Sequence, residues 1–168
     1  ITVATNLKSL AKDTAIYGVS SIFGRFLNYL LVPLYTATLS AASGGYGVIT
    51  NLYAWTALLL VILTYGMETT FFRFANKADE DAEKVYSTTL VSVGATALMF
   101  VAAVVGFLPG ISSALGYADH QSWVVSMAII VALDAFQAIP FAYLRYKKQP
   151  IKFAGLKLAF IFINILLN

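Results

Sequence analysis

Cysteine is absent from the 168 residues of the chain, and histidine occurs once, as His120. The lack of cysteine excludes disulfide bonds, thiolate metal sites and cysteine nucleophiles within these residues. One histidine cannot supply a histidine metal cluster. The sequence also has no glycine-rich phosphate-binding loop, no metal-ligand spacing and no Ser/His/Asp arrangement. We therefore expect that the chain is not an enzyme and that it needs no cofactor.

Charged residues are also scarce, at 11% of the chain, whereas 60% of the residues are hydrophobic. A soluble globular domain carries about 25% charged residues, so this composition predicts an integral membrane protein. A net charge of +3 is compatible with a nucleic-acid partner, but the basic residues gather at the ends of the apolar runs. That distribution is typical of membrane orientation, and we expect no nucleic-acid partner.

Five apolar runs have the length of transmembrane helices, and they predict an all-α, polytopic membrane helix bundle. The runs lie at about residues 14–38, 48–72, 87–108, 122–144 and 151–168. The first residue is Ile1, and the last run has not ended at Asn168. We therefore expect the chain to be part of a longer protein.

The basic residues gather on one predicted side of the membrane. They form three groups: Lys8 and Lys12; Arg73, Lys77 and Lys84; Arg145, Lys147, Lys148 and Lys152. The two opposite connections, around Gly44 and around Gly116, contain neither lysine nor arginine. By the positive-inside rule, the N-terminus and the basic connections are predicted to be cytoplasmic. In the acidic run from Asp79 to Glu83 we expect a solvated loop or a helix N-terminus.

Polar and ionisable residues occur inside four of the apolar runs, at helical spacing. The pairs are Arg25 with Asn28, Thr64 with Glu68, Asp134 with Gln137, and Lys157 with Asn164. The members of each pair are three, four or seven positions apart, and this spacing predicts one shared helix face. Because lipid penalises charged groups, such residues are candidates for function.

Arg25 is the deepest cation among these residues. It lies about 16 Å along a helix that begins at Thr14, which is half of a hydrocarbon core roughly 30 Å thick. A guanidinium stays charged, so at this depth it must face protein, water or an anion. Two interpretations stay open: Arg25 binds an anionic substrate, or it pairs with Asp134 and holds the bundle together. Asp134 is equally a candidate site for H⁺ or Na⁺.

Three further charged residues lie closer to the predicted cytoplasmic ends of their runs. Lys157 is about 9 Å inside the fifth run, from where its side chain can reach the membrane surface. Glu68 and Arg73 lie near the end of the second run, where an ion pair and a gate are both open interpretations. Glu68, Arg73 and Asp134 are thus candidates for a gate or for ion coupling.

Four segments of the chain carry a resemblance to a known family. They are residues 10–18 (LAKDTAIYG), 24–36 (GRFLNYLLVPLYT), 46–50 (YGVIT) and 65–74 (YGMETTFFRF). Together they resemble the opening of bacterial polysaccharide biosynthesis flippases. These proteins belong to the multidrug/oligosaccharidyl-lipid/polysaccharide exporter superfamily. The resemblance covers about the first ninety residues closely and the rest mainly through the pattern of apolar runs.

The resemblance implies a transporter of about twelve or more helices in two similar lobes, working by alternating access in the bacterial inner membrane. This chain would be part of the N-terminal lobe, with the remainder of the transporter and membrane lipids as its partners. The implied substrate is an undecaprenyl-pyrophosphate-linked oligosaccharide of the O-antigen, lipopolysaccharide or capsule type. Coupling to H⁺ or Na⁺ is possible.

The resemblance also bears on the residues that contact substrate. Arg25 matches a first-helix arginine that lines the cavity in lipid II flippases, but residues 30–34 (LLVPL) lack the second arginine of those proteins. A cationic patch with amide groups suits pyrophosphate and sugar hydroxyls, because a guanidinium binds phosphate oxygens in a bidentate manner. The candidates for substrate binding are Arg25, Asn28, Asp134, Gln137 and Lys157.

Two other functions stay open. A cation-coupled multidrug antiporter of the same superfamily would use Asp134 or Glu68 as its proton or sodium site. Arg25 argues against this function, because a fixed cation in the cavity disfavours cationic drugs. A small membrane scaffold or assembly protein, in contrast, would use its charges only to pair with one another.

Overall fold

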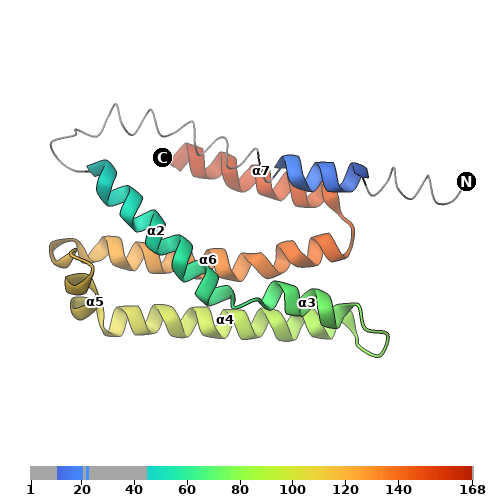
Figure 1. The fold of residues 1–168 in the computed structure, drawn as a ribbon, viewed down its shortest axis with the longest axis horizontal. Helices are drawn as coiled ribbons and strands as arrows, with labels where there is room; N and C mark the ends of the chain where they lie inside the picture. Colours follow the sequence, from blue (N-terminus) through green and yellow to red (C-terminus); the bar gives the residue numbers. More distant parts are fainter. Residues whose placement is uncertain (1–10, 21, 23–44, 168) are drawn as a thin grey trace, which may run out of the picture. The chain divides into compact units, whose positions relative to one another are not determined.

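The described part of the chain is helical throughout its regular elements. A computed structural model describes the backbone of residues 11–20, 22 and 45–167, and the side chains of these residues except 45, 46 and 164–167. Residues 11–20 form an N-terminal helical segment. The elements that follow are α2 (Gly45–Thr64), α3 (Met67–Ala75), α4 (Ala82–Gly106), α5 (Leu108–Ala114), the 3-10 turn η2 (Ala118–His120), α6 (Gln121–Tyr146) and α7 (Pro150–Leu167) (Figure 1). The predicted all-α class is confirmed.

Three stretches of the described residues are long and apolar enough to cross a membrane. They are Gly47–Ala75, Ala82–Gly106 and Ala118–Tyr146. Their outer faces expose large apolar side chains, of which Val61, Leu98 and Leu133 are 71%, 74% and 62% exposed. Contiguous apolar surface of this kind is unfavourable in water and suits lipid. The polytopic membrane class predicted from composition is therefore confirmed.

The chain divides into two compact units. Unit 1 consists of Ile1–Tyr46 and Leu144–Asn168, and unit 2 of Gly47–Tyr143. The N-terminal helical segment and α7 thus belong to unit 1. Unit 2 contains α3, α4, α5, η2 and nearly all of α2 and α6.

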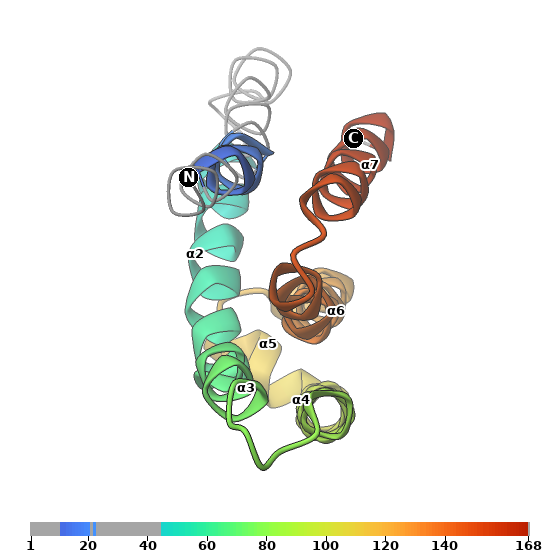
Figure 2. The same ribbon diagram turned by 90° about the vertical axis from the view of Figure 1, so that its right-hand side faces the viewer.

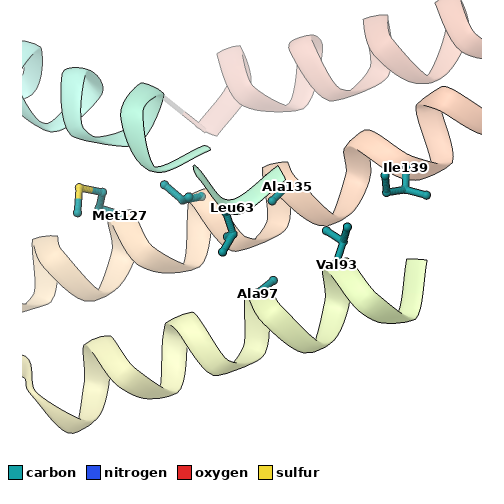
Figure 3. Close-up of a cluster of buried hydrophobic side chains, with 7 residues drawn as sticks. Leu63, Val93, Ala97, Met127, Ala135 and Ile139 are labelled. Atoms are coloured by element: carbon teal, nitrogen blue, oxygen red, sulfur yellow. The ribbon is translucent and has the colours of Figure 1, made fainter. Parts of the chain in front are cut away.

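The core of unit 2 lies where α2, α4 and α6 meet. Its buried members are Leu63 from α2, Val93 and Ala97 from α4, and Met127, Val131, Ala135 and Ile139 from α6 (Figure 3). The α6 members recur at every fourth position and therefore form one stripe along the helix. α4 and α6 run antiparallel beside each other in both views (Figures 1 and 2).

A close approach between α4 and α6 depends on Gly94. A Cβ atom at this position would lie 3.3 Å from Cε2 of Phe136. That distance is shorter than an ordinary van der Waals contact between carbon atoms. Glycine therefore lets the Phe136 ring pack directly on the backbone of α4, as small residues do where membrane helices pack closely.

The second predicted run, at residues 48–72, is not one continuous helix. α2 ends at Thr64, and α3 begins at Met67. Between them, the φ values are 31° for Tyr65 and 72° for Gly66. Positive φ values interrupt a right-handed helix, and glycine adopts them without steric cost. α3 is less apolar than α2, but the two helices fall in one predicted run because no charged residue separates them before Glu68.

The ends of α4 lie earlier than the predicted run at 87–108. Asp81 caps the helix, because its side chain accepts a hydrogen bond of 3.0 Å from the backbone N–H of Glu83. Glu83 in the first turn also interacts favourably with the helix dipole. The acidic run is exposed and leads into a helix N-terminus, so that prediction is confirmed. At the other end, Pro109 lies in the first turn of α5, so the connection around Gly116 is largely helical.

Serine and threonine hydroxyls in α2 and α4 bond to their own helices. Each donates a hydrogen bond to the carbonyl oxygen four residues earlier, at 2.7–3.1 Å. These residues are Thr56, Thr64, Ser87, Thr89, Ser92 and Thr96. The bonds satisfy these six hydroxyls locally, which lowers the cost of placing them in an apolar environment.

Candidate functional site

Asp134 and Gln137 lie together on α6. Gln137 Nε2 donates a hydrogen bond of 2.5 Å to Asp134 Oδ1, and both side chains are half-buried. Their spacing of three positions places them one turn apart on the same face. The structure thus brings together this pair of predicted site residues.

Pro140 lies inside α6, one turn beyond Gln137. Proline has no N–H, so it cannot donate the helical hydrogen bond to the carbonyl of Phe136. Two turns of α6 therefore contain the carboxylate of Asp134, the amide of Gln137 and the backbone carbonyl of Phe136, which lacks its helical hydrogen-bond donor. Oxygen-rich groups of this kind suit a proton, a hard cation such as Na⁺, or the hydroxyls of a sugar.

Lys157 is the cation of α7, in unit 1. Its side chain is half-buried, and it lies about 10 Å along the helix from Pro150. The side chain of its predicted partner Asn164 lies outside the described residues. Lys157 therefore has the partial burial expected of a cation that extends along an apolar helix surface.

Glu68 and Arg73 both lie on the short helix α3. Glu68 is half-buried in the first turn and Arg73 is exposed in the last turn. Negative charge at the N-terminus and positive charge at the C-terminus both complement the helix dipole. The two residues are five positions apart and so do not share a helix face.

The predicted pairing of Thr64 with Glu68 on one helix face is wrong. The break at Tyr65 and Gly66 separates the two residues into α2 and α3. The Thr64 hydroxyl donates to the carbonyl of Leu60 at 2.9 Å, within its own helix. Thr64 therefore contributes a satisfied hydroxyl to α2 rather than a polar face shared with Glu68.

Arg25 and Asn28 lie outside the described residues. Their roles remain sequence predictions.

An aromatic cluster of unit 2 was not among the predicted site residues. Tyr86 and Tyr143 stack with ring centroids 4.2 Å apart, and Phe71 lies 6.3 Å from each of them. The cluster joins α3, α4 and α6. Each of these rings lies where an apolar run meets a basic connection, a position at which membrane proteins concentrate aromatic side chains. That position in the sequence is the signal from which the cluster could have been found.

A second aromatic group lies at the start of α6. His120 and Trp123 stack with centroids 4.0 Å apart and planes at 11°, and Tyr117 meets Trp123 edge-on at 6.1 Å. Trp123 lies in the first turn of α6, and tryptophan is enriched where membrane helices meet the interface. Since α6 carries aromatic groups near both ends, its apolar middle has the form of a membrane-spanning segment with interfacial anchors.

The described polar groups suit binding and charge compensation. No group of three or more His, Cys, Asp or Glu residues that could hold a metal ion occurs among the residues that the structure describes. The groups that the helices do present are a carboxylate–amide pair on α6, an ammonium on α7 and a carboxylate with a guanidinium on α3.

Comparison with known families gives one match. The model of a family described as polysaccharide biosynthesis protein matches residues 10–149. The match includes Arg25, Glu68 and Asp134, and it ends before Lys157. It confirms the resemblance inferred from the first ninety residues and extends it to residue 149. No curated protein and no solved structure matches the chain.

Proposed function

The chain belongs to the polysaccharide biosynthesis protein family, and from this premise we propose that it moves a lipid-linked oligosaccharide across the bacterial inner membrane. The observation that carries the proposal is the family match over residues 10–149. The family supports a polysaccharide biosynthesis or flippase-type function in general. We propose further that the substrate is an undecaprenyl-pyrophosphate-linked oligosaccharide of the O-antigen or lipopolysaccharide type.

The proposed substrate has two kinds of polar group, and the polar residues divide between them. Arg25 and Lys157 carry positive charge for the pyrophosphate, for which the planar guanidinium offers two parallel donors. Asn28 and the Asp134–Gln137 pair offer amide and carboxylate groups for sugar hydroxyls. Binding and release then need no bond to be made or broken in the substrate, in accord with a transporter that is not an enzyme.

We propose alternating access as the mechanism, with Asp134 as the coupling group. A proton or Na⁺ at the Asp134 carboxylate would compete with the hydrogen bond from Gln137. Loss of that bond one turn before Pro140 acts on the part of α6 where helical hydrogen bonding is already reduced. Glu68 and Arg73, at opposite ends of α3, are the gate candidates, because a short helix after a backbone break can move as a unit.

Deletion of the encoding gene in its natural host tests this function. We expect surface polysaccharide to be lost and the lipid-linked oligosaccharide to accumulate on the cytoplasmic side of the membrane. Accumulation is the decisive readout, because it shows that synthesis proceeds and translocation fails.

The other candidate functions give different results in the same strain. Unchanged surface polysaccharide with loss of drug efflux would indicate a multidrug antiporter. Loss of the lipid-linked oligosaccharide itself, without accumulation, would indicate a scaffold for the biosynthetic enzymes. Either result would overturn the proposed translocation.

A further inference from the structure

An apolar groove lies between the N-terminal helical segment and α7, within unit 1. Its volume is about 460 Å³, within the range of roughly 300–1,000 Å³ that is usual for small-molecule sites. It is lined by Ala15, Ile16, Val19, Ser20, Ala154 and Leu158. Two of these residues are alanines, one from each helix, and their short side chains leave the space between the helices.

Among the described residues that line the groove, the one hydroxyl, that of Ser20, is directed back to its own helix. Ser20 Oγ donates to the carbonyl oxygen of Ile16 at 2.7 Å and lies 3.2 Å from that of Tyr17. Ser20 is 5% exposed. The described lining residues therefore offer a ligand hydrocarbon contacts, and the Ser20 hydroxyl is already bonded, which favours an apolar chain as the occupant.

Aromatic and basic side chains lie next to the groove. The rings of Tyr17 and Phe153 meet edge-on at 5.0 Å, and the Arg145 guanidinium lies 6.0 Å from the centroid of the Phe153 ring. Tyr17 and Phe153 directly adjoin the groove residues Ile16 and Ala154 in the sequence. Asp13, on the helical segment, is the acidic group within electrostatic range of Tyr17.

The connection between α6 and α7 gives this region a net positive charge. Residues 145–152 contain Arg145, Lys147, Lys148 and Lys152 and no acidic residue. Lys148 and Lys152 are exposed. Four cations against the single carboxylate of Asp13 suit a pyrophosphate better than the single phosphodiester of a membrane phospholipid.

We propose that this groove binds the polyisoprenoid chain of the lipid-linked substrate, with its phosphate groups at the basic residues 145–152. The proposal rests on the proposed function, because it assigns a place to the lipid part of that substrate. The chemistry is that of an amphiphile: a saturated apolar surface takes the chain, and the cations take the phosphates.

Photolabelling of the full chain tests the groove. The chain is reconstituted in vesicles of phosphatidylethanolamine and phosphatidylglycerol with a polyisoprenyl pyrophosphate that carries a diazirine on its hydrocarbon chain. We expect the label on the groove residues of the two helices. Unlabelled polyisoprenyl pyrophosphate should remove it, whereas an equal excess of phosphatidylglycerol should not.

Two variants and a matched control sharpen the result. Ala154→Leu places a larger side chain in the groove and should lower groove labelling roughly tenfold, because the added atoms occupy the space that the ligand chain needs. Ala159→Leu makes the same change at an exposed position of α7 and should leave labelling within about twofold. The double variant Lys148→Gln/Lys152→Gln leaves the groove residues unaltered. It should also lower labelling, because it removes two exposed positive charges that are proposed to bind the phosphates.

Three results would overturn the groove proposal. Label spread evenly around α7 would show that the probe behaves as ordinary bilayer lipid. Equal competition by phosphatidylglycerol would show that the groove binds a membrane phospholipid. Absence of groove label in the unaltered chain would show that another protein segment covers the groove. Because the probe carries no saccharide, groove labelling reports lipid binding and does not depend on export. Groove labelling combined with unchanged surface polysaccharide in the deletion strain would therefore overturn the proposed translocation and leave the groove proposal standing. Loss of export without groove labelling would overturn the groove alone.

Discussion

At the scale of single residues, Gly94 determines how closely α4 approaches α6. Gly94→Leu places a large side chain where even a Cβ atom would lie 3.3 Å from the Phe136 ring. We expect a loss of about 1–3 kcal/mol in the free energy of unfolding, since added atoms in a packed contact force side chains or helices apart. Thermal unfolding of the purified protein in detergent measures this change.

Two further variants show whether the contact with Phe136 is the cause. Phe136→Ala combined with Gly94→Leu should recover most of the loss, because Phe136 is 41% exposed and its removal opens the space. Gly106→Leu is the control, since no atom lies within 4 Å of a Cβ at that position. Equal losses in the free energy of unfolding for Gly94→Leu and Gly106→Leu would show that replacing glycine in the backbone causes the loss, and that the contact with Phe136 does not.

Arg25 and Asp134 are the residues at which substrate binding and structural pairing give opposite results. If Arg25 binds pyrophosphate, Arg25→Lys keeps the charge but loses the bidentate geometry, so the protein should accumulate normally and export poorly. If Arg25 only neutralises Asp134, Arg25→Ala with Asp134→Asn should restore both stability and export. A double-mutant cycle with expression level and surface polysaccharide as readouts separates the two roles.

We expect the double variant to recover expression without export, because the site has lost the bidentate guanidinium and Lys157 offers only a single ammonium to the pyrophosphate. Gln137→Leu is a useful companion. It removes the amide that donates to Asp134 but leaves Arg25 unchanged. Recovery of export in the Arg25/Asp134 double variant would disprove the binding role of Arg25.

At the scale of helices, Gly66 fixes the break between α2 and α3. Gly66 has φ of 72°, and no atom lies within 4 Å of a Cβ built there. Gly66→Ala should therefore destabilise the protein by about 1–2 kcal/mol through backbone strain alone. Limited proteolysis and thermal unfolding would detect the loss.

Gly155→Ala is the matched control for this substitution. It too has no atom within 4 Å of the added Cβ, but it lies inside the helix α7 without a positive φ. Alanine in a helix interior is favoured over glycine by about 0.5–1 kcal/mol, so stability should rise slightly. A stabilising effect of Gly66→Ala would mean that α2 and α3 form one continuous helix.

The helices could be predicted from the sequence to differing degrees, for physical reasons. Long apolar runs predict α4 and α6 well, because a segment that crosses a membrane has to form its backbone hydrogen bonds internally, as a helix does. The break at Tyr65 and Gly66 could not be predicted, since it depends on backbone angles rather than hydropathy. The Asp134–Gln137 contact follows from helical spacing, whereas the aromatic cluster and the groove depend on which helices meet.

At the scale of the whole molecule, the orientation in the membrane is open to direct measurement. The chain has no cysteine, so single introduced cysteines report accessibility without background. Ser113→Cys and Ala78→Cys both lie at exposed positions, on α5 and between α3 and α4. An impermeant maleimide added to intact cells should label Ser113→Cys, whereas Ala78→Cys should need permeabilised cells.

The reverse labelling pattern would contradict the predicted orientation. It would place the basic connections outside the cytoplasm and would move the basic residues 145–152 to the opposite surface. Labelling of both positions in intact cells would instead show that α4 does not cross the membrane.

The hydroxyls of α2 and α4 bear on how easily these helices slide. Each of the six bonds to a carbonyl in its own helix, so donor and acceptor travel together when the helix shifts along its axis. None of these bonds has to break as α4 moves past α6. Besides the stacked rings of Tyr86 and Tyr143, the apolar contacts that sliding exchanges are van der Waals contacts of about 0.1–0.2 kcal/mol each. The resistance to sliding of one helix along another in unit 2 therefore depends mainly on the shapes of the side chains. Shear of the helices is the motion that this arrangement resists least.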